Sequence, residues 1–455
     1  MITPQEYKER RSKLIDQIDS NSIMVLYAGC LIKASADEAF PFNVNKNFFY
    51  LTGITQPNSV LVLVKTKTRI REYLFIDEVD MKKVVWTGKM LSKEEASVIS
   101  GVEEVEWNFE NREGFCDFIT RKVRDVFSFR KLYVDLEEFN YYKPGKTVKD
   151  FVKSMRSSFK GFKVIDAYPL IARMRMVKSP AEIEEIRKSI ETTRIGFEEV
   201  LKTTKPGQFE YNVSSTLLHS FMMHNNSGLA FNTIAASGKN AVILHYPFPT
   251  EQLKDGDCVL LDFGAEKDCY RADISRTFPI NGKFTAQQKD IYEMVLRCNK
   301  AVQEYIKPGV TILDCQSFCF DYLTGQLLSG GYISTASVDA KHQLAIKEAL
   351  KETGKESLSD EEKNELYKSV LHDEVFEYYY HGVSHHLGLD THDVGDRKIP
   401  LEPGMIITNE PGLYFEELGI GVRIEDDILV TENGCENLSK SIIKEIDDIE
   451  QMMSK

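Results

Sequence analysis

The chain has 455 residues, of which 42% are apolar and 28% charged, and its formal net charge is −13. This length exceeds one ordinary core, so we expect two or more domains in a soluble globular protein. The acidic excess and the scattered basic residues argue against nucleic acid as a partner. We find no apolar run of membrane-spanning length, and the charged segment from Met1 to Ser20 lacks the apolar core of a secretion signal. We therefore expect no membrane partner and a cytoplasmic location.

The cysteines form no Cys-x-x-Cys pair and none lies at zinc-finger spacing from a histidine. We interpret them as buried free thiols of a reducing compartment, which again favours the cytoplasm. The eight are Cys30, Cys116, Cys258, Cys269, Cys298, Cys315, Cys319 and Cys435.

The first 165 residues alternate short apolar runs with helix-like stretches, a pattern that predicts an α/β domain. The predicted strands are Met24–Gly29 and the runs that begin at Ser59, Tyr73, Lys131 and Phe162. The predicted helices fall near Lys93–Ser100 and Gly145–Ser157.

A strong helix start follows, because Ser179 can cap the helix, Pro180 suits its first position and Glu182 completes a capping box. We place the domain boundary here, with an N-terminal domain of residues 1–170 and a C-terminal domain of residues 171–455. The helices expected in the second domain are Ala181–Thr203, Glu210–His224, Ala286–Ile306 and Ile312–Leu328. Residues 336–375 are charged and helix-favouring, and we interpret them as a solvated insertion without assigned chemistry.

Two aspartates flank a turn in the stretch Val259–Phe278. Asp262 ends an apolar run that predicts a buried strand, and Asp273 opens the next strand. A carboxylate in an apolar strand is unfavourable unless it is paired or bound to metal. Two converging carboxylates also resist ionising together, and a cation would relieve both costs.

Four of the nine histidines lie within twelve residues, at His381, His385, His386 and His392. Imidazole serves both as a metal ligand and as a proton carrier, so such a cluster indicates a site rather than isolated structural residues. It is not a zincin motif, because no glutamate follows His381 or His385.

Glu410 and Glu425 supply two further carboxylates at the ends of apolar stretches. Strand alternation puts Arg423 on the same face as Glu425, which also allows a simple surface salt bridge. Asp426 and Asp427 beside them are interpreted as solvated or turn residues. Four carboxylates and an imidazole match two divalent cations, most simply Mn²⁺, with Co²⁺, Zn²⁺ or Fe²⁺ also possible. Hydrolysis of an amide is the natural reaction of such a pair.

In this order, the five segments resemble the pita-bread metallopeptidases, which include methionine aminopeptidase, aminopeptidase P and prolidase. The resemblance implies an α/β (α+β) chain with an N-terminal domain of creatinase/aminopeptidase P type and a C-terminal pita-bread catalytic domain. It implies metal ligands at Asp262, Asp273, His385, Glu410 and Glu425, with Asp273 and Glu425 bridging both ions.

The same resemblance implies catalytic roles for residues around these ligands. His245, His381 and His392 resemble histidines that bind substrate and stabilise the tetrahedral intermediate. Glu410 would also carry the proton, Arg423 would orient the last carboxylate, and Tyr414 matches a tyrosine near the site.

The N-terminal segments Asn45–Val64 and Phe75–Ser92, including Trp86-Thr87-Gly88, are similar to aminopeptidase P and eukaryotic-type prolidase. Methionine aminopeptidase lacks this domain. Two departures from aminopeptidase P are His386, where tryptophan is common, and the short loop Val394–Leu401, which leaves Arg397 without an assigned role.

The expected reaction is therefore removal of the first residue from peptides with proline in second position. Two alternatives stay open: an Xaa-Pro dipeptidase (prolidase), and a non-catalytic pita-bread protein that binds partners. The resemblance also implies a homodimer or homotetramer.

Overall fold

The computed structural model describes residues 2–108, 118–119, 121, 130–136, 144–158, 161–224 and 228–454. The chain divides into two compact units, Met1–Arg175 and Met176–Lys455. Within the described residues, no helix combines the length and the hydropathy needed to cross a membrane.

The N-terminal unit is built on a six-stranded mixed sheet in the order β4-β3-β2-β1-β5-β6. Neighbours β1–β2 and β2–β3 are antiparallel, and the remaining pairs are parallel. The strands are β1 (Ser22–Tyr27), β2 (Val60–Lys65), β3 (Ile70–Ile76), β4 (Glu104–Trp107), β5 (Lys131–Val134) and β6 (Lys163–Asp166). The helices are α1 (Pro4–Gln17), α2 (Lys46–Thr52), α3 (Met81–Thr87), α4 (Lys93–Ser100), α6 (Pro144–Ser158) and α7 (Tyr168–Met176). The predicted alternation of strands and helices is confirmed.

The core of this unit forms where apolar side chains of alternate strand positions meet one face of α6. Val60, Val62 and Val64 of β2 share that face because side chains alternate along a strand. Phe151 and Met155 of α6 pack against the same cluster, four residues apart on one side of the helix.

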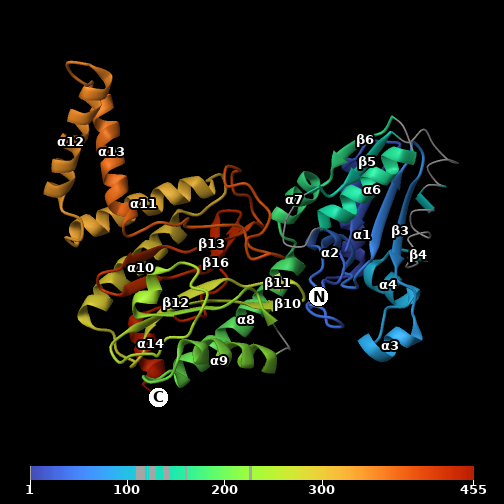
Figure 1. Cartoon of the computed structure of the whole chain (residues 1–455), viewed down its shortest axis with the longest axis horizontal. Coiled ribbons are helices and arrows are strands. Elements are labelled where there is room, and N and C mark those ends of the chain that lie inside the picture. The colour runs from blue at the N-terminus through green and yellow to red at the C-terminus, as the bar shows by residue number, and fades with distance from the viewer. Residues whose placement is uncertain are drawn as a thin grey trace. The chain divides into compact units, whose positions relative to one another are not determined.

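The first long helix of the C-terminal unit is α8 (Pro180–Thr203), whose capping box pairs Ser179 and Glu182 as predicted. Its strands lie between α8 and α9 on one side and α10 and α11 on the other (Figure 1). The strands are β7 (Gly228–Leu229), β8 (Ile234–Ser237), β9 (Cys258–Phe263), β10 (Ala265–Lys267), β11 (Tyr270–Arg271), β12 (Ile274–Pro279), β13 (Ile406–Asn409), β14 (Gly412–Phe415), β15 (Ile420–Arg423), β16 (Asp426–Thr431) and β17 (Gly434–Asn437). The remaining helices are α9 (Glu210–Met223), the 3₁₀ helix η2 (Gly238–Val242), α10 (Ala286–Tyr305), α11 (Ile312–Ser329), α12 (Thr335–Thr353), α13 (Asp360–Phe376) and α14 (Ile446–Met453).

The segment predicted to be a solvated insertion folds as a pair of helices, α12 and α13, which extend away from the rest of the C-terminal unit (Figure 1). We call this pair the α12–α13 hairpin. His342 of α12 contacts the carbonyl oxygen of Lys363 in α13 at 2.8 Å, and Lys341 forms an ion pair with Glu374. The two helices are therefore braced against each other, although most of their side chains are exposed.

Among the described residues seven cysteines are free, and four of them are buried: Cys258, Cys298, Cys315 and Cys319. The expectation that all thiols are buried is wrong for Cys30, which is exposed, while Cys269 and Cys435 are partly exposed. Cys116 lies outside the described residues.

Candidate metal centre

The first pair of candidate ligands comes from the antiparallel strands β9 and β12. Asp262 of β9 lies opposite Ser275 of β12, and Asp273 precedes that strand by one residue. Because side chains alternate along a strand, Asp273 lies on the same face as Ser275. It is therefore the diagonal neighbour of Asp262 across the strand pair. Gly264 allows the strands to approach, since a Cβ at this position would lie 1.8 Å from the carbonyl oxygen of Ala272. The turn thus brings the two aspartates together, as the sequence predicts.

The second pair comes from the antiparallel strands β13 and β16. Asn409 ends β13 opposite Asp426, the first residue of β16. Glu410 follows the one strand and Glu425 precedes the other, so the glutamates flank the same end of the pair. The backbone amide of Glu425 donates to the carbonyl oxygen of Ser275 at 3.0 Å, which ties this pair to the first.

His385 joins the carboxylates. Its Nε2 lies 3.3 Å from Asp273 Oδ2 and 3.5 Å from Glu410 Oε1. One potential ligand atom from each of Asp273, His385 and Glu425 lies within 4.8 Å of the others. The second ring nitrogen, Nδ1, lies 3.0 Å from the carbonyl oxygen of His386 and must carry the proton, because a carbonyl only accepts. The Nε2 lone pair therefore points toward the carboxylates, which is the arrangement of a metal-binding histidine.

The electrostatics of this cluster favour a cation. Burial, and then the negative charge of Asp262, raises the pKa of Asp273 well above its ordinary value. Burial, and then Asp273, does the same to the pKa of Glu425, and burial raises that of Glu410. Within the described residues, the buried Oδ1 of Asp262 has no hydrogen-bond partner. Carboxylates held together without enough positive charge fit divalent metal ions, whose binding would allow all of them to ionise.

Arg423 supplies the fixed positive charge at the edge of the cluster. Its Nη2 pairs with Asp262 Oδ2 at 2.7 Å, and its Nε donates to Ser275 Oγ at 2.9 Å. Ser275 Oγ in turn donates to Glu425 Oε2 at 2.7 Å. Arg423 and Glu425 thus share a face, as alternation predicts, but the guanidinium pairs directly with Asp262 and reaches the last carboxylate through Ser275.

A chain of hydrogen bonds leads from Arg423 to His381. Arg423 Nη1 donates to Tyr414 Oη at 2.9 Å, and Tyr414 Oη lies 2.9 Å from His381 Nε2. His381 Nδ1 lies 2.9 Å from the carbonyl oxygen of Gly382, so this nitrogen carries the ring proton and Nε2 accepts from Tyr414. Burial, and then the charge of Arg423, lowers the pKa of His381 to about 3, which keeps the ring neutral. The same ring lies 3.8 Å from Glu410 Oε2.

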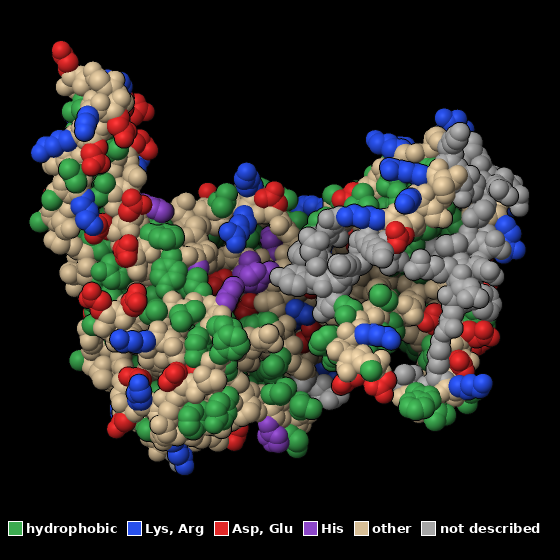
Figure 2. Space-filling model, in the orientation of Figure 1, with side chains coloured by type: hydrophobic (Ala, Val, Ile, Leu, Met, Phe, Trp, Pro, Cys, Tyr) green, Lys and Arg blue, Asp and Glu red, His purple; other side chains and the backbone are tan. Residues whose placement is uncertain are grey.

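His245 and His392 lie at the open side of the cluster. The rings of His392 and His385 have centroids 4.1 Å apart. His245 is exposed and follows η2, and after burial it is among the neighbours that lower the pKa of His381 and of His392. In the space-filling view, histidine side chains gather in a hollow of the catalytic unit, with acidic side chains beside them (Figure 2). The cluster is thus accessible from solvent.

The loop that carries His245 is fixed by a buried carboxylate that the sequence did not single out. Glu210, the first residue of α9, accepts hydrogen bonds from the backbone amide of Ser237, the side chain of Asn240 and the backbone amide of Glu251. These partners bracket the residue on both sides. A glutamate at a helix start has an ordinary explanation, so the sequence alone does not mark Glu210 as part of a site.

Ser275 and Thr408 were also missed, although each lies two residues from a candidate ligand. Thr408 Oγ1 accepts from the backbone amide of His385 at 3.1 Å and donates to Glu410 Oε1 at 3.2 Å. Strand periodicity from Asp273 to Ser275 and from Thr408 to Glu410 is the signal that identifies them.

The interpretation of Asp426 and Asp427 as solvated residues is wrong, because both are fully buried. Asp426 forms ion pairs with Arg276 and Lys444. Asp427 Oδ2 accepts from the backbone amide of Asp273 at 3.3 Å. Their partners are distant in sequence, so the acidic run alone resembled a surface segment.

Two family models match the chain. Metallopeptidase family M24 matches residues 184–432, which include all five candidate ligands. The aminopeptidase P N-terminal domain matches residues 7–127.

Full-length relatives agree with these matches. The chain is 33% identical to the Xaa-Pro aminopeptidase of Escherichia coli (strain K12), over 99% of this chain and 98% of the relative. A solved structure of a putative aminopeptidase P from Bacillus anthracis superposes with a TM-score of 0.87 at 37% identity, covering 100% of this chain and 99% of the other. The E. coli aminopeptidase P with the inhibitor Pro-Leu superposes with a TM-score of 0.83 at 32% identity, covering 100% and 98%.

Proposed function

We propose that this chain hydrolyses the N-terminal Xaa-Pro bond of peptides and releases the first residue. The chain belongs to metallopeptidase family M24 and to its Xaa-Pro aminopeptidases. The chain is a metal-dependent hydrolase with an N-terminal aminopeptidase P domain and a pita-bread catalytic domain. The observation that carries the proposal is the buried acidic cluster, in which Asp273 and Glu410 lie 3.3 and 3.5 Å from His385 Nε2 and the charges of Asp262 and Glu425 act on their neighbours.

The divalent ions that the family implies fit this cluster. Asp262, Asp273, His385, Glu410 and Glu425 would hold them. Two ions would balance four carboxylates, and the oxygen-rich donor set favours Mn²⁺. When bound, such ions lower the pKa of a coordinated water and polarise a carbonyl group.

The side chains around the cluster would bind the peptide and move its protons. Glu410 would carry the proton to the departing proline nitrogen, since its carboxylate lies at the edge of the cluster beside His385 and His381. His245 and His392 would face the substrate carbonyl groups, where donors stabilise developing negative charge. Arg423 and Tyr414 would hold Asp262 and His381 in place.

The comparisons support an aminopeptidase over both alternatives. Relatives that match the whole chain are named Xaa-Pro aminopeptidases, so a dipeptidase is disfavoured. A non-catalytic relative would be expected to lack ligands, whereas here all five candidates are present. The Pro-Leu inhibitor of the E. coli structure has the free N-terminal proline that the products of this reaction would carry.

A homodimer or homotetramer in the cytoplasm completes the proposal. The free thiols of the described chain suit a reducing compartment. On α3 of the N-terminal unit, Met81, Val85 and Trp86 are 70–86% exposed, an apolar surface that contact with another subunit would cover.

Product analysis by mass spectrometry after addition of Mn²⁺ tests the reaction. The substrates are an Xaa-Pro dipeptide, an Xaa-Pro-Yaa tripeptide and the same tripeptide with alanine in place of proline. We expect cleavage of the proline tripeptide before proline and loss of cleavage with chelator. Cleavage of the dipeptide alone would identify a prolidase, and the absence of metal-dependent cleavage would contradict the proposal.

A further inference from the structure

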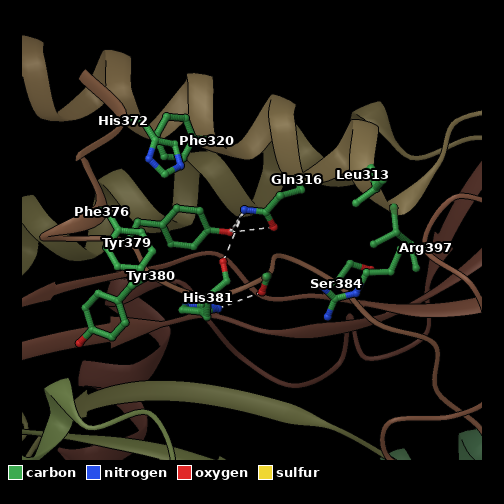
Figure 3. A pocket seen from close by; sticks show the side chains of 12 residues that line it. Leu313, Gln316, Phe320, His372, Phe376, Tyr379, Tyr380, His381, Ser384 and Arg397 are labelled. Carbon is green, nitrogen blue, oxygen red and sulfur yellow. Dashed lines mark hydrogen bonds between the residues drawn. The ribbon is translucent and has the colours of Figure 1, made fainter. Parts of the chain in front are cut away.

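A pocket of about 310 Å³ lies beside the candidate metal centre. It is lined at one end by Phe320, His372 and Phe376 and at the other by Leu313 and Arg397, with His381 in its wall (Figure 3). This volume is at the lower end of the range for small-molecule sites and suits a short piece of peptide.

The pocket adjoins the candidate metal centre, because His381 lines the pocket and its Nδ1 lies 3.8 Å from Glu410 Oε2. Gln316 of α11 fixes this wall: its Oε1 accepts from the backbone amide of Val383 at 2.6 Å. Its Nε2 donates to the carbonyl oxygen of His381 at 3.4 Å. A peptide bound at the metal centre would therefore have a preformed space next to His381.

The α12–α13 hairpin supplies the aromatic end of the pocket. His372 of α13 stacks on Phe320 of α11, with ring centroids 4.9 Å apart and planes inclined by 19°. Phe376, the last residue of α13, lies 6.1 Å from His372 and is 53% exposed. An aromatic surface left open beside a cavity is one that an apolar group can cover.

The charge of the pocket decides which part of a peptide it suits. The described residues that line it include no carboxylate, and Arg397 places a cation there. The α-ammonium group of a peptide's first residue would be disfavoured against this lining, because it would meet the like charge of Arg397 and no lining side chain is a carboxylate. The residues after the proline lead toward the C-terminal carboxylate and carry no α-ammonium group. They are therefore not repelled by Arg397.

We propose that this pocket binds the residues that follow the substrate's proline, and that His372 and Phe376 select an apolar side chain there. The inference rests on the proposed function and adds to it a preference for the kind of side chain that follows the proline. The α12–α13 hairpin is then a specificity element of the peptidase.

The test compares kcat/KM for four peptides: Ala-Pro-Gly-Gly-Gly, two forms with phenylalanine at the third or fourth position, and Phe-Pro-Gly-Gly-Gly. We expect one of the two downstream phenylalanines to raise kcat/KM about tenfold, the lower range for apolar discrimination in a pocket. Phe376→Ala and His372→Ala should bring this ratio close to one, mainly by raising KM for the preferred phenylalanine peptide. Leu344→Ala is the matched control, because Leu344 is 56% exposed on the same hairpin and does not line the pocket.

Three results would overturn the inference. In the first, the ratio of kcat/KM between the preferred phenylalanine peptide and the all-glycine peptide stays unchanged in both variants. In the second, the variants slow all four peptides equally and have a lowered Tm. In the third, they affect only the peptide that begins with phenylalanine. Calorimetric binding of Pro-Phe-Gly-Gly and Pro-Gly-Gly-Gly gives a readout that does not need turnover. If no proline peptide is cleaved, the proposed function is contradicted. The binding role of the pocket is then decided by calorimetry: it is contradicted if Phe376→Ala binds Pro-Phe-Gly-Gly as tightly as the wild type does.

Discussion

Two neighbouring carboxylates of the catalytic unit, Glu425 and Asp426, are both buried but have opposite surroundings. Burial would raise the pKa of Asp426, yet Arg276 and Lys444 outweigh it and lower this pKa to about 2. Burial raises the pKa of Glu425, and Asp273 raises it further. Alternation along the strand sends the first side chain into the acidic cluster and the second into an ion-pair network. A carboxylate with protein cations stabilises the fold, whereas one without them is available to a metal.

The largest effect is expected when the acidic cluster is changed. Glu425→Gln keeps the shape of the side chain but removes one negative charge and one ligand. Since bound metal contributes several kcal/mol to hydrolysis, we expect kcat/KM for an Xaa-Pro tripeptide to fall roughly 10³-fold. The metal-free variant should melt no earlier than wild type, because a charge that resists burial is gone. Full activity in this variant would contradict the assignment of the ligands.

The neighbouring substitution, Asp426→Asn, should affect the fold instead. It leaves Arg276 buried without its partner, and breaking a buried pair in this way costs about 3 kcal/mol or more of unfolding free energy. Urea unfolding measures this loss, and metal content per chain should stay at the wild-type value at temperatures where the variant is folded. If Asp426→Asn lost metal but kept its unfolding free energy, Asp426 would have to be counted with Glu425 as part of the metal site.

The smallest effect is a difference in pH dependence. In the metal-free protein the pKa values of Asp273 and Glu425 are raised, so the folded state holds protons that the unfolded state releases. Their stabilisation is complete below the unfolded pKa values, about 4, and is lost as pH rises through the folded ones. We expect the Tm of the metal-free protein to be lower at pH 8 than at pH 6.

Two controls sharpen this measurement. Mn²⁺ should remove the fall in Tm, since the cation replaces the protons. The slope should persist in Asp426→Asn, because the lowered pKa of Asp426 gives stability that is present at both of these pH values and is lost only as pH falls. An unchanged slope in Glu425→Gln would exclude Glu425 as its source.

The sequence predicts the elements and the acidic cluster because both depend on local pattern. The capping box at Ser179 and Glu182 and the apolar runs before Asp262 and Glu410 can be recognised without knowledge of contacts. Partners across strands are not local. Arg276 is 150 residues from Asp426, so nothing near Asp426 indicates that it is buried and paired.

The role of the α12–α13 hairpin could not be predicted for the same reason. Its charged composition correctly predicts exposed helices, but the stacking of His372 on Phe320 joins residues of two different helices. A pocket that forms between such elements has no signature in either one. The shape of a binding site therefore depends on packing, whereas ligand chemistry can be recognised from the sequence.

The hydrogen bonds of His381 have a fixed order, from Arg423 through Tyr414 and the imidazole to the carbonyl oxygen of Gly382. The ring is a donor on one side and an acceptor on the other, so two amide side chains can imitate its halves separately. Asparagine places an amide nitrogen where Nδ1 donates, and the longer glutamine places an amide oxygen where Nε2 accepts. His381→Asn would thus keep the hydrogen bond to Gly382 and lose the one from Tyr414. His381→Gln would keep the hydrogen bond from Tyr414 and lose the one to Gly382.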